Sequence, residues 1–121
     1  MTLQLISFGF LHDVPPTAHR VEDLRDRYRD PAAARPILDL DGRDGRVQAV
    51  VLATPGVAEL VDNLTAYALL PIGPATIALG CAGGRHRAPA VAEILAARLR
   101  DLGRLVDVDH RHVHLPRVLT T

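Results

Sequence analysis

A glycine-rich loop with three consecutive basic residues is the part of this sequence best suited to chemistry. The loop reads Gly80-Cys81-Ala82-Gly83-Gly84-Arg85-His86-Arg87 and follows a short apolar run, residues 75–79. Glycine allows positive φ angles, and a helix that starts after such a loop directs its backbone N–H groups at one point. Arginine adds a two-point fork that fits a phosphate. The loop is therefore predicted to bind an anion, with the residues from Cys81 to Arg87 as its contacts.

The same loop also contains the C-x5-R spacing of cysteine phosphatases, between Cys81 and Arg87. A helix N-terminus and nearby arginines lower the pKa of a thiol, so a nucleophilic cysteine is chemically sound here. The match is incomplete, because Ala88 stands where Ser or Thr usually follows the arginine, and Gly80 where His usually precedes the cysteine. We therefore favour a binding module over an enzyme and keep a cysteine-dependent phosphatase as the alternative.

The basic residues and aromatic residues bear on two further classes of protein. All 14 basic residues are arginine, which excludes the phosphate-binding lysine of a Walker A loop. The formal net charge is zero, and the chain has two Phe, two Tyr and no Trp. Binding to RNA needs cationic contacts and stacking platforms, so an RNA-binding adaptor is only the third hypothesis.

Three histidines, His110, His112 and His114, alternate near the end of the chain. On a strand they would share one face and could meet a metal ion. The run continues into Leu115-Pro116 without an obvious carboxylate partner, so neither a metal nor another cofactor is predicted. His110 and Arg25, at neighbouring strand ends, are instead expected to help the loop to hold its ligand. His12 and His19 are expected to be surface residues without a chemical role.

The elements that must position the loop follow the order of a parallel α/β sheet. Apolar runs predict strands at 3–8, 21–25, 75–79 and 105–113, and helical spacing predicts helices at 45–54, 55–70 and 91–102. Thr54 is predicted to cap the second helix and Pro55 to open it. The sequence thus predicts a small, mostly parallel sheet of about four strands with helices packed on it. The ligand loop lies at a strand-to-helix turn.

The whole chain has the size and composition of one folded domain, residues 1–121. It is 48% hydrophobic and 23% charged, which is ordinary for a globular protein. No apolar stretch approaches the ~20 residues that a bilayer span needs, and the N-terminus lacks the pattern of a signal peptide. The single cysteine excludes an intramolecular disulfide. A cytoplasmic protein without a membrane partner is expected.

The loop resembles the signature G-C-[TA]-G-G-x-H-R of the C-terminal domain of the RapZ family. Ile6–Phe10 is similar to the opening I-S-F-G-F of that domain, residues 21–25 and 40–55 resemble two further regions, and His110-Arg111 matches the His-Arg after its last strand. The resemblance covers nearly the whole chain and implies a bacterial regulatory domain. It implies an amino-sugar phosphate as ligand, a small RNA as a partner in some bacteria, and self-association as a dimer.

Two positions depart from the pattern of the family. Ala82 stands where many members have Thr, which removes a hydroxyl contact, and Tyr28 or Arg29 is the nearest match to a family His in a Pro-x-His segment. The nucleotide-binding domain that precedes this domain in the family has no counterpart in these residues. We therefore expect a stand-alone binding half, for which inorganic phosphate and sulfate are the simplest ligands.

Overall fold

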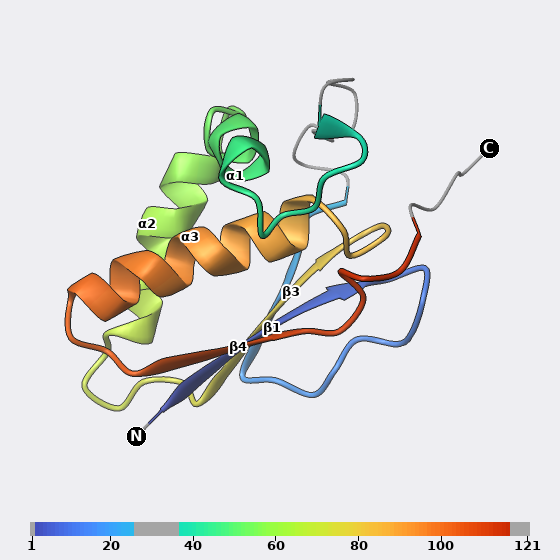
Figure 1. Ribbon diagram of the computed structural model, residues 1–121. Coiled ribbons are helices and arrows are strands. Elements are labelled where there is room, and N and C mark those ends of the chain that lie inside the picture. The colour runs from blue at the N-terminus through green and yellow to red at the C-terminus, as the bar shows by residue number, and fades with distance from the viewer. Residues whose placement is uncertain (1, 26–36, 117–121) are drawn as a thin grey trace.

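The computed structural model describes residues 2–25 and 37–116, which form a single parallel sheet and the helices packed on it (Figure 1). The strands are β1 (Leu3–Gly9), β2 (Arg20–Asp23), β3 (Thr76–Cys81) and β4 (Val106–His110), and the helices are α1 (Gly45–Leu52), α2 (Val57–Ala68) and α3 (Arg87–Asp101). The strand order is β2-β3-β1-β4, and every pairing is parallel. The predicted α/β fold with about four strands is confirmed.

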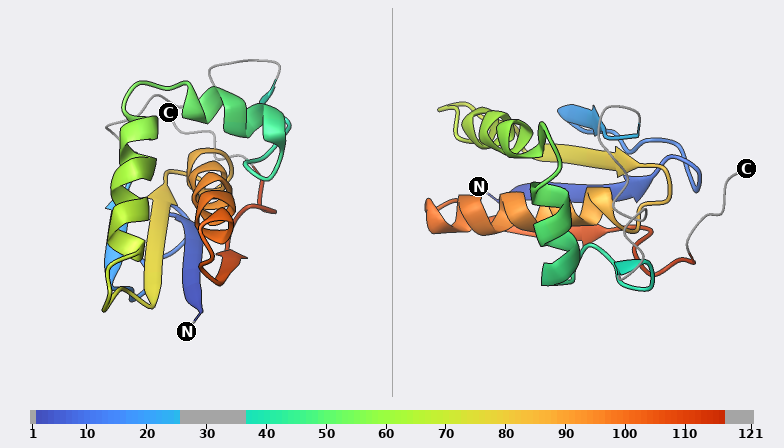
Figure 2. Two further views of the ribbon diagram at one scale, coloured as in Figure 1. Left: turned by 90° about the vertical axis from the view of Figure 1, so that its left-hand side faces the viewer. Right: turned by 90° about the horizontal axis from the view of Figure 1, so that it is seen from above.

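The helices lie on one face of the sheet, and the β1–β2 connection covers the other (Figures 1 and 2). The connections β2–β3 and β3–β4 step across the sheet in one direction, whereas β1–β2 steps in the opposite direction. If all three crossovers are right-handed, the β1–β2 connection must therefore run over the opposite face of the sheet from the β2–β3 and β3–β4 connections. Phe10 and Ala18 of the β1–β2 connection pack against the buried side chains of Ile6, Phe8 and Ala78. Both faces are covered, as a parallel sheet needs.

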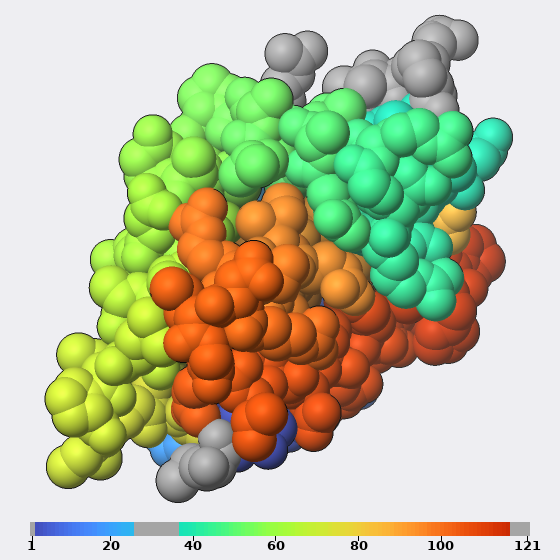
Figure 3. All heavy atoms as spheres, turned by 60° about the vertical axis from the view of Figure 1, so that its left-hand side comes forward, coloured from blue at the N-terminus to red at the C-terminus, as the bar shows by residue number. Residues whose placement is uncertain are grey.

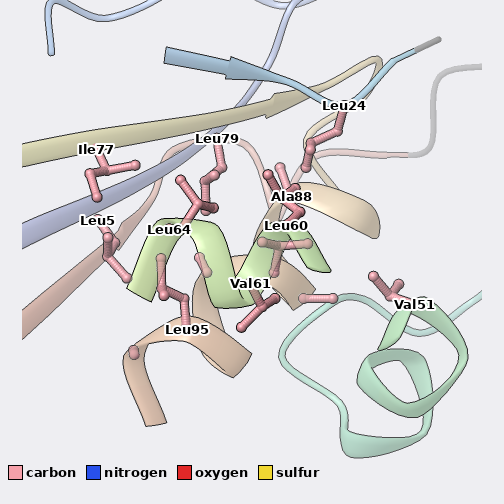
Figure 4. Close-up of a cluster of buried hydrophobic side chains, with 14 of the residues drawn as sticks. Leu5, Leu24, Val51, Leu60, Val61, Leu64, Ile77, Leu79, Ala88 and Leu95 are labelled. Atoms are coloured by element: carbon pink, nitrogen blue, oxygen red, sulfur yellow. The ribbon is translucent and has the colours of Figure 1, made fainter. Parts of the chain in front are cut away.

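The main core fills the space between the sheet and the helices, where alternate strand residues meet α2 and α3. Figure 4 shows Leu5, Leu64, Ile77, Leu79 and Leu95 directed into this space, and each is fully buried. Helix α3 is central, because it contacts β1, β3, β4 and both other helices; in the space-filling view it lies between α2, α1 and β4 (Figure 3). No helix within residues 2–25 and 37–116 has the length and hydropathy of a membrane span.

The predicted start of α2 is wrong by two residues. Thr54 does not cap this helix, because its hydroxyl donates to the carbonyl of Val50 at 3.1 Å and so belongs to the end of α1. Gly56, with a φ of 92°, then reverses the chain direction, and the helix begins at Val57. A left-handed residue is readily supplied by glycine, which explains the short link between two helices here.

The predicted edges of α3 and β4 also differ from the structure. Helix α3 begins at Arg87 and not at Val91, because the small buried residues Ala88 and Ala90 pack as helical residues on the sheet. Strand β4 ends at His110, after which the chain turns and the N–H of Leu115 donates to the carbonyl of His112. The glycine-rich loop therefore leads directly into the first turn of α3.

Candidate functional site

The carboxyl ends of all four strands meet at one edge of the sheet, and the turn from β3 into α3 lies at this edge. Gly80 and Cys81 are the last residues of β3, so residues 82–86 form the turn itself. Ligands of open parallel sheets usually bind outside the carboxyl ends of the strands. The predicted strand-to-helix loop is therefore in the position where the fold favours a ligand.

The turn is held by a close contact between its backbone and the end of β1. A Cβ on Gly84 would lie 2.7 Å from the amide nitrogen of Gly9 and 2.9 Å from the Cβ of His112. Gly84 also has a φ of 72°, whereas Gly83 does not have a positive φ. A Cβ on Gly9 would in turn lie 2.5 Å from the carbonyl carbon of Gly83. Only glycine fits at Gly9 and Gly84, which explains their place in the loop.

The groups of the turn best placed to bind an anion are its backbone N–H groups. The N–H groups of Ala82, Gly83 and Arg85 have no hydrogen-bond acceptor among the residues that the structure describes, and all three residues are partly exposed. The first turn of α3 contains no acidic residue, and its N-cap, His86, makes no side-chain capping bond. Helix N-termini carry a partial positive charge. The turn therefore offers several donors and a favourable potential to a single anion.

The thiol of Cys81 lies beneath this turn and shapes it. Cys81 is 3% exposed, and its Sγ accepts the N–H of Gly84 at 3.2 Å and that of Ala88 at 3.5 Å. The middle of the turn and the first turn of α3 are thus tied to one sulfur atom. A nucleophile must be reached by its substrate, and the enclosed position of this sulfur opposes such a role.

The two arginines of the loop have different surroundings. Arg87 is 7% exposed, and its Nη1 donates to the carbonyls of Leu24 and Arg25, both at 2.8 Å, so it fastens the chain after β2 to the start of α3. Arg85 donates from Nη2 to the carbonyl of Asp39 and from Nη1 to that of Leu115. Its Nε is buried and has no acceptor within the described part of the chain. Arg85 therefore has one buried N–H group whose hydrogen-bonding capacity no described residue satisfies.

Arg25 follows β2 by two residues, because the strand ends at Asp23 and not at the predicted Arg25, and two neighbours hold it in place. The expectation that Arg25 and His110 lie at neighbouring strand ends is wrong, since β2 and β4 are the two outer strands of the sheet. The guanidinium of Arg25 donates to both carboxylate oxygens of Asp23, with the shortest bond at 2.7 Å. The same group lies 3.7 Å over the ring of Phe10. These contacts fix Arg25 at the edge of the site, where its carbonyl also accepts from Arg87.

His110, also predicted to touch the ligand, uses both ring nitrogens within the protein. Its Nδ1 lies 2.6 Å from the hydroxyl oxygen of the buried Ser7, and its Nε2 lies 2.8 Å from Oε1 of Glu93 on α3. This chain of contacts joins β1, β4 and α3. The structure therefore brings His110 to the carboxyl edge of the sheet, but both ring nitrogens contact protein side chains, Ser7 of β1 and Glu93 of α3.

His112 is the residue of the site that the sequence did not reveal. Its Nδ1 accepts the N–H of Gly9 at 2.8 Å, its Cβ lies against Gly84, and its ring lies 5.1 Å from that of His12, centroid to centroid. Burial, and then the nearby His12, lower the pKa of His112 below the usual histidine value. The only sequence signal was the alternation of histidines, and β4 ends before His112. Within the described residues no group of three metal-ligating side chains forms.

The side chains of the remaining predicted positions, Ala82, Tyr28 and Arg29, make no polar contact that the structure describes. Ala82 lies in the turn, where its carbonyl accepts the N–H of Leu11 at 3.0 Å and its methyl group replaces the hydroxyl expected from the resemblance. Tyr28 and Arg29 lie outside the described residues.

Comparison with known proteins identifies relatives over nearly the whole chain. A family model described as the RapZ C-terminal domain matches residues 1–114. A nucleotide-binding protein of Syntrophobacter fumaroxidans is 36% identical over 95% of this chain and 43% of its own length. Nucleotide-binding proteins of Laribacter hongkongensis and Thermobifida fusca are 40% and 37% identical over 93% and 88% of this chain. The chain spans about two fifths of the length of these relatives, from 39% to 43%.

Proposed function

Because this chain belongs to the family of the RapZ C-terminal domain, we propose that it is a regulatory module that holds a phosphorylated metabolite on the Gly80–Arg87 loop. The observation that carries the proposal is the set of unused donors at the start of α3. The N–H groups of Ala82, Gly83 and Arg85 and the buried Nε of Arg85 have no acceptor among the described residues.

A phosphate group matches these donors in charge and in number of acceptor atoms. A terminal phosphate presents three strongly accepting oxygens, and hydrogen bonds from N–H groups to an anion contribute about 1.5 to 3 kcal/mol each. The absence of an acidic side chain in the first turn of α3 leaves the helix dipole uncompensated there. Sulfate has similar geometry and is a suitable simple probe.

The family resemblance proposes an amino-sugar phosphate as the natural ligand. The relatives are named nucleotide-binding proteins, and a nucleotide would offer the same phosphate chemistry. The donors of the turn recognise the phosphate alone, so they do not distinguish the two. Residues beside the turn, such as Arg25 and Asp23 after β2, must therefore distinguish a sugar from a nucleoside attached to the phosphate.

The phosphatase alternative rests on the spacing of Cys81 and Arg87. Against it, the sulfur is enclosed and accepts two N–H groups of its own loop, and Arg87 donates to carbonyls of the chain after β2. Both groups support the shape of the site. An aryl phosphate assay of the wild type and Cys81→Ser tests the alternative: turnover that disappears with the cysteine would establish an enzyme.

Calorimetric titration tests the binding proposal. The ligands are inorganic phosphate, sulfate, an amino-sugar phosphate, the same amino sugar without phosphate, and a nucleoside monophosphate. We expect the phosphorylated ligands to bind and the unphosphorylated sugar not to bind. Arg85→Gln should weaken binding about tenfold, since it removes a positive charge from the turn that holds the anion.

Arg46→Gln is the matched control for this titration. Arg46 is an exposed arginine at the start of α1 whose guanidinium pairs with Asp44, and its replacement should leave the affinity unchanged. Equal affinity for the sugar with and without phosphate, or equal weakening by the two arginine variants, would contradict the proposal.

A further inference from the structure

His112 joins three segments that meet at the carboxyl edge of the sheet. Its ring accepts the N–H of Gly9 at the end of β1, and its Cβ lies against the backbone of Gly84 in the anion loop. Its own segment, residues 111–115, starts with a bond from the N–H of Arg111 to the carbonyl of Ser7. A single imidazole therefore connects β1, the turn before α3 and the segment after β4.

The contact with Gly9 fixes the protonation state of the imidazole. Because Nδ1 accepts an N–H group, the neutral ring carries its proton on Nε2. Adding a second proton at Nδ1 would place two donors against each other at a separation of 2.8 Å. The Gly9 contact therefore exists only while His112 is neutral, and protonation must break it.

The groups around His112 also oppose its protonation. The β1–β2 connection places His12 and Asp13 beside it, its own segment adds Arg111 and His114, and the neighbouring Gly83-Gly84 turn contributes backbone only. One carboxylate thus faces one arginine and two further imidazoles. The ring is partly buried as well, and both effects lower the pKa of His112.

The segment that His112 holds is connected to the anion loop. The carbonyl of His112 accepts the N–H of Leu115 at 3.1 Å, and the carbonyl of Leu115 accepts Nη1 of Arg85 at 3.3 Å. Displacement of residues 111–115 would therefore disturb Gly84 through the Cβ of His112 and Arg85 through the carbonyl of Leu115. Arg85 belongs to the donor set of the proposed anion site, and Gly84 lies between two of its members, Gly83 and Arg85.

We propose that His112 is a proton-sensitive latch: when neutral it holds the 111–115 segment on Gly9 and keeps the turn in its anion-binding shape, and when protonated it releases both. His112 is thus a positioning residue, and this inference rests on the proposed function only for its effect on ligand affinity. The latch itself is a property of the protein without ligand.

The latch predicts an unusual sign of pH dependence. Protonated histidines near an anion normally strengthen its binding by adding positive charge. Here, protonation of His112 should weaken the binding of sulfate, because the turn before α3 loses the contact that holds its shape. Sulfate is the appropriate probe, since it does not change its own charge between pH 7.5 and 5.0, whereas phosphate does.

Amide hydrogen exchange of the protein without ligand tests the latch directly. Across the pH range in which an NMR titration of the His112 ring shows that it takes up its proton, the protection factor of the Gly9 amide should fall about tenfold, the worth of one hydrogen bond. In His112→Asn the side-chain oxygen can still accept from Gly9 but cannot be protonated at this pH, so protection should be independent of pH. His19→Asn is the matched control, because Nδ1 of His19 also accepts a backbone N–H, that of Ala75, at the opposite edge of the sheet.

Three results separate the latch from the proposed function. Constant protection of Gly9 in the wild type, or an equal fall in His112→Asn, would overturn the latch. A fall in the wild type and in His19→Asn, together with weaker sulfate binding at pH 5.0, would support it. If no sulfate binds at any pH, the proposed function fails, and exchange at Gly9 still decides the latch. A histidine NMR titration of the wild type, in which His112 and the Gly9 amide must titrate together, covers the case of an unfolded variant.

Discussion

At the scale of single residues, the backbones of Gly84 and Gly9 lie so close together that neither position has room for a Cβ. Gly84→Ala places a Cβ 2.7 Å from the nitrogen of Gly9 in a residue with a φ of 72°. We expect a loss of at least about 2 kcal/mol in the free energy of unfolding and loss of sulfate binding. Urea unfolding and calorimetry measure the two effects.

The matched control for this variant is Gly103→Ala. Gly103 has a φ of 88°, but a Cβ there would have no neighbour within 4 Å. Its replacement should cost only the left-handed backbone, about 1 kcal/mol, and should leave sulfate binding intact. If the two variants lose equal stability and both bind sulfate, the close contact at Gly84 does not shape the site.

Arg87 makes a second testable contribution, because its guanidinium is buried against the carbonyls of Leu24 and Arg25. Arg87→Met should lower the free energy of unfolding by about 2 to 3 kcal/mol, since two buried acceptors lose a charged donor. Arg98→Met is the control, because Arg98 pairs with Asp62 on the surface and such pairs contribute less than about 1 kcal/mol. Equal losses in urea unfolding would show that Arg87 has no structural role.

The residue types of the site could be predicted from the sequence, but most of their contact partners could not. The loop and its glycines were predictable, because their types and spacing report backbone geometry directly. The partners of Arg87 and His110 were not, since they come from segments 17 to 103 positions away along the chain. His112 was missed because its contact with Gly9 depends on where β4 ends.

At the scale of elements, side-chain contacts from Ser7 to His110 and from His110 to Glu93 link β1, β4 and α3 near the site. Ser7→Ala should remove the partner of Nδ1 of His110 and lower the free energy of unfolding by about 1 to 2 kcal/mol. Because α3 carries the turn, this variant should also weaken sulfate binding.

Thr65→Val is the matched control for Ser7→Ala. Its buried hydroxyl donates only to the carbonyl of Val61, within α2. Its loss should lower stability by less than about 1 kcal/mol and leave sulfate affinity unchanged. If Ser7→Ala retains the sulfate affinity of the wild type in calorimetry, the link does not support the site.

Element order was predictable from the sequence, and element ends were not. The strand, glycine loop, helix and strand of the second half follow from local apolar patterns, and they appear as β3, α3 and β4. The start of α2 depended on whether Thr54 bonds forward or backward, and both choices satisfy a hydroxyl. Such ends are decided by packing, which a single sequence does not contain.

At the scale of the whole molecule, the titration of His112 makes stability depend on pH. Its pKa in the folded protein is lowered, so between that value and the value of the unfolded chain the unfolded chain binds more protons. The stabilising contribution is therefore fully present above the ordinary histidine pKa and is lost as pH falls through the folded value. Urea unfolding should show lower stability at pH 5.0 than at pH 7.5.

His112→Asn isolates this contribution from the carboxylates that also titrate in acid. The variant should lose less stability than the wild type on acidification, whereas His19→Asn should follow the wild type. Identical pH profiles for all three proteins would remove His112 as a source of the dependence.

The central claim is that the turn before α3 binds an anion through its backbone donors. An NMR titration of the wild type and Gly84→Ala with sulfate at pH 7.5 tests it most directly. We predict saturable shifts centred on the amides of Ala82, Gly83 and Arg85 in the wild type and no saturable shift of these amides in the variant. Unchanged amides in the wild type, or saturable shifts confined to other parts of the chain, would contradict the account.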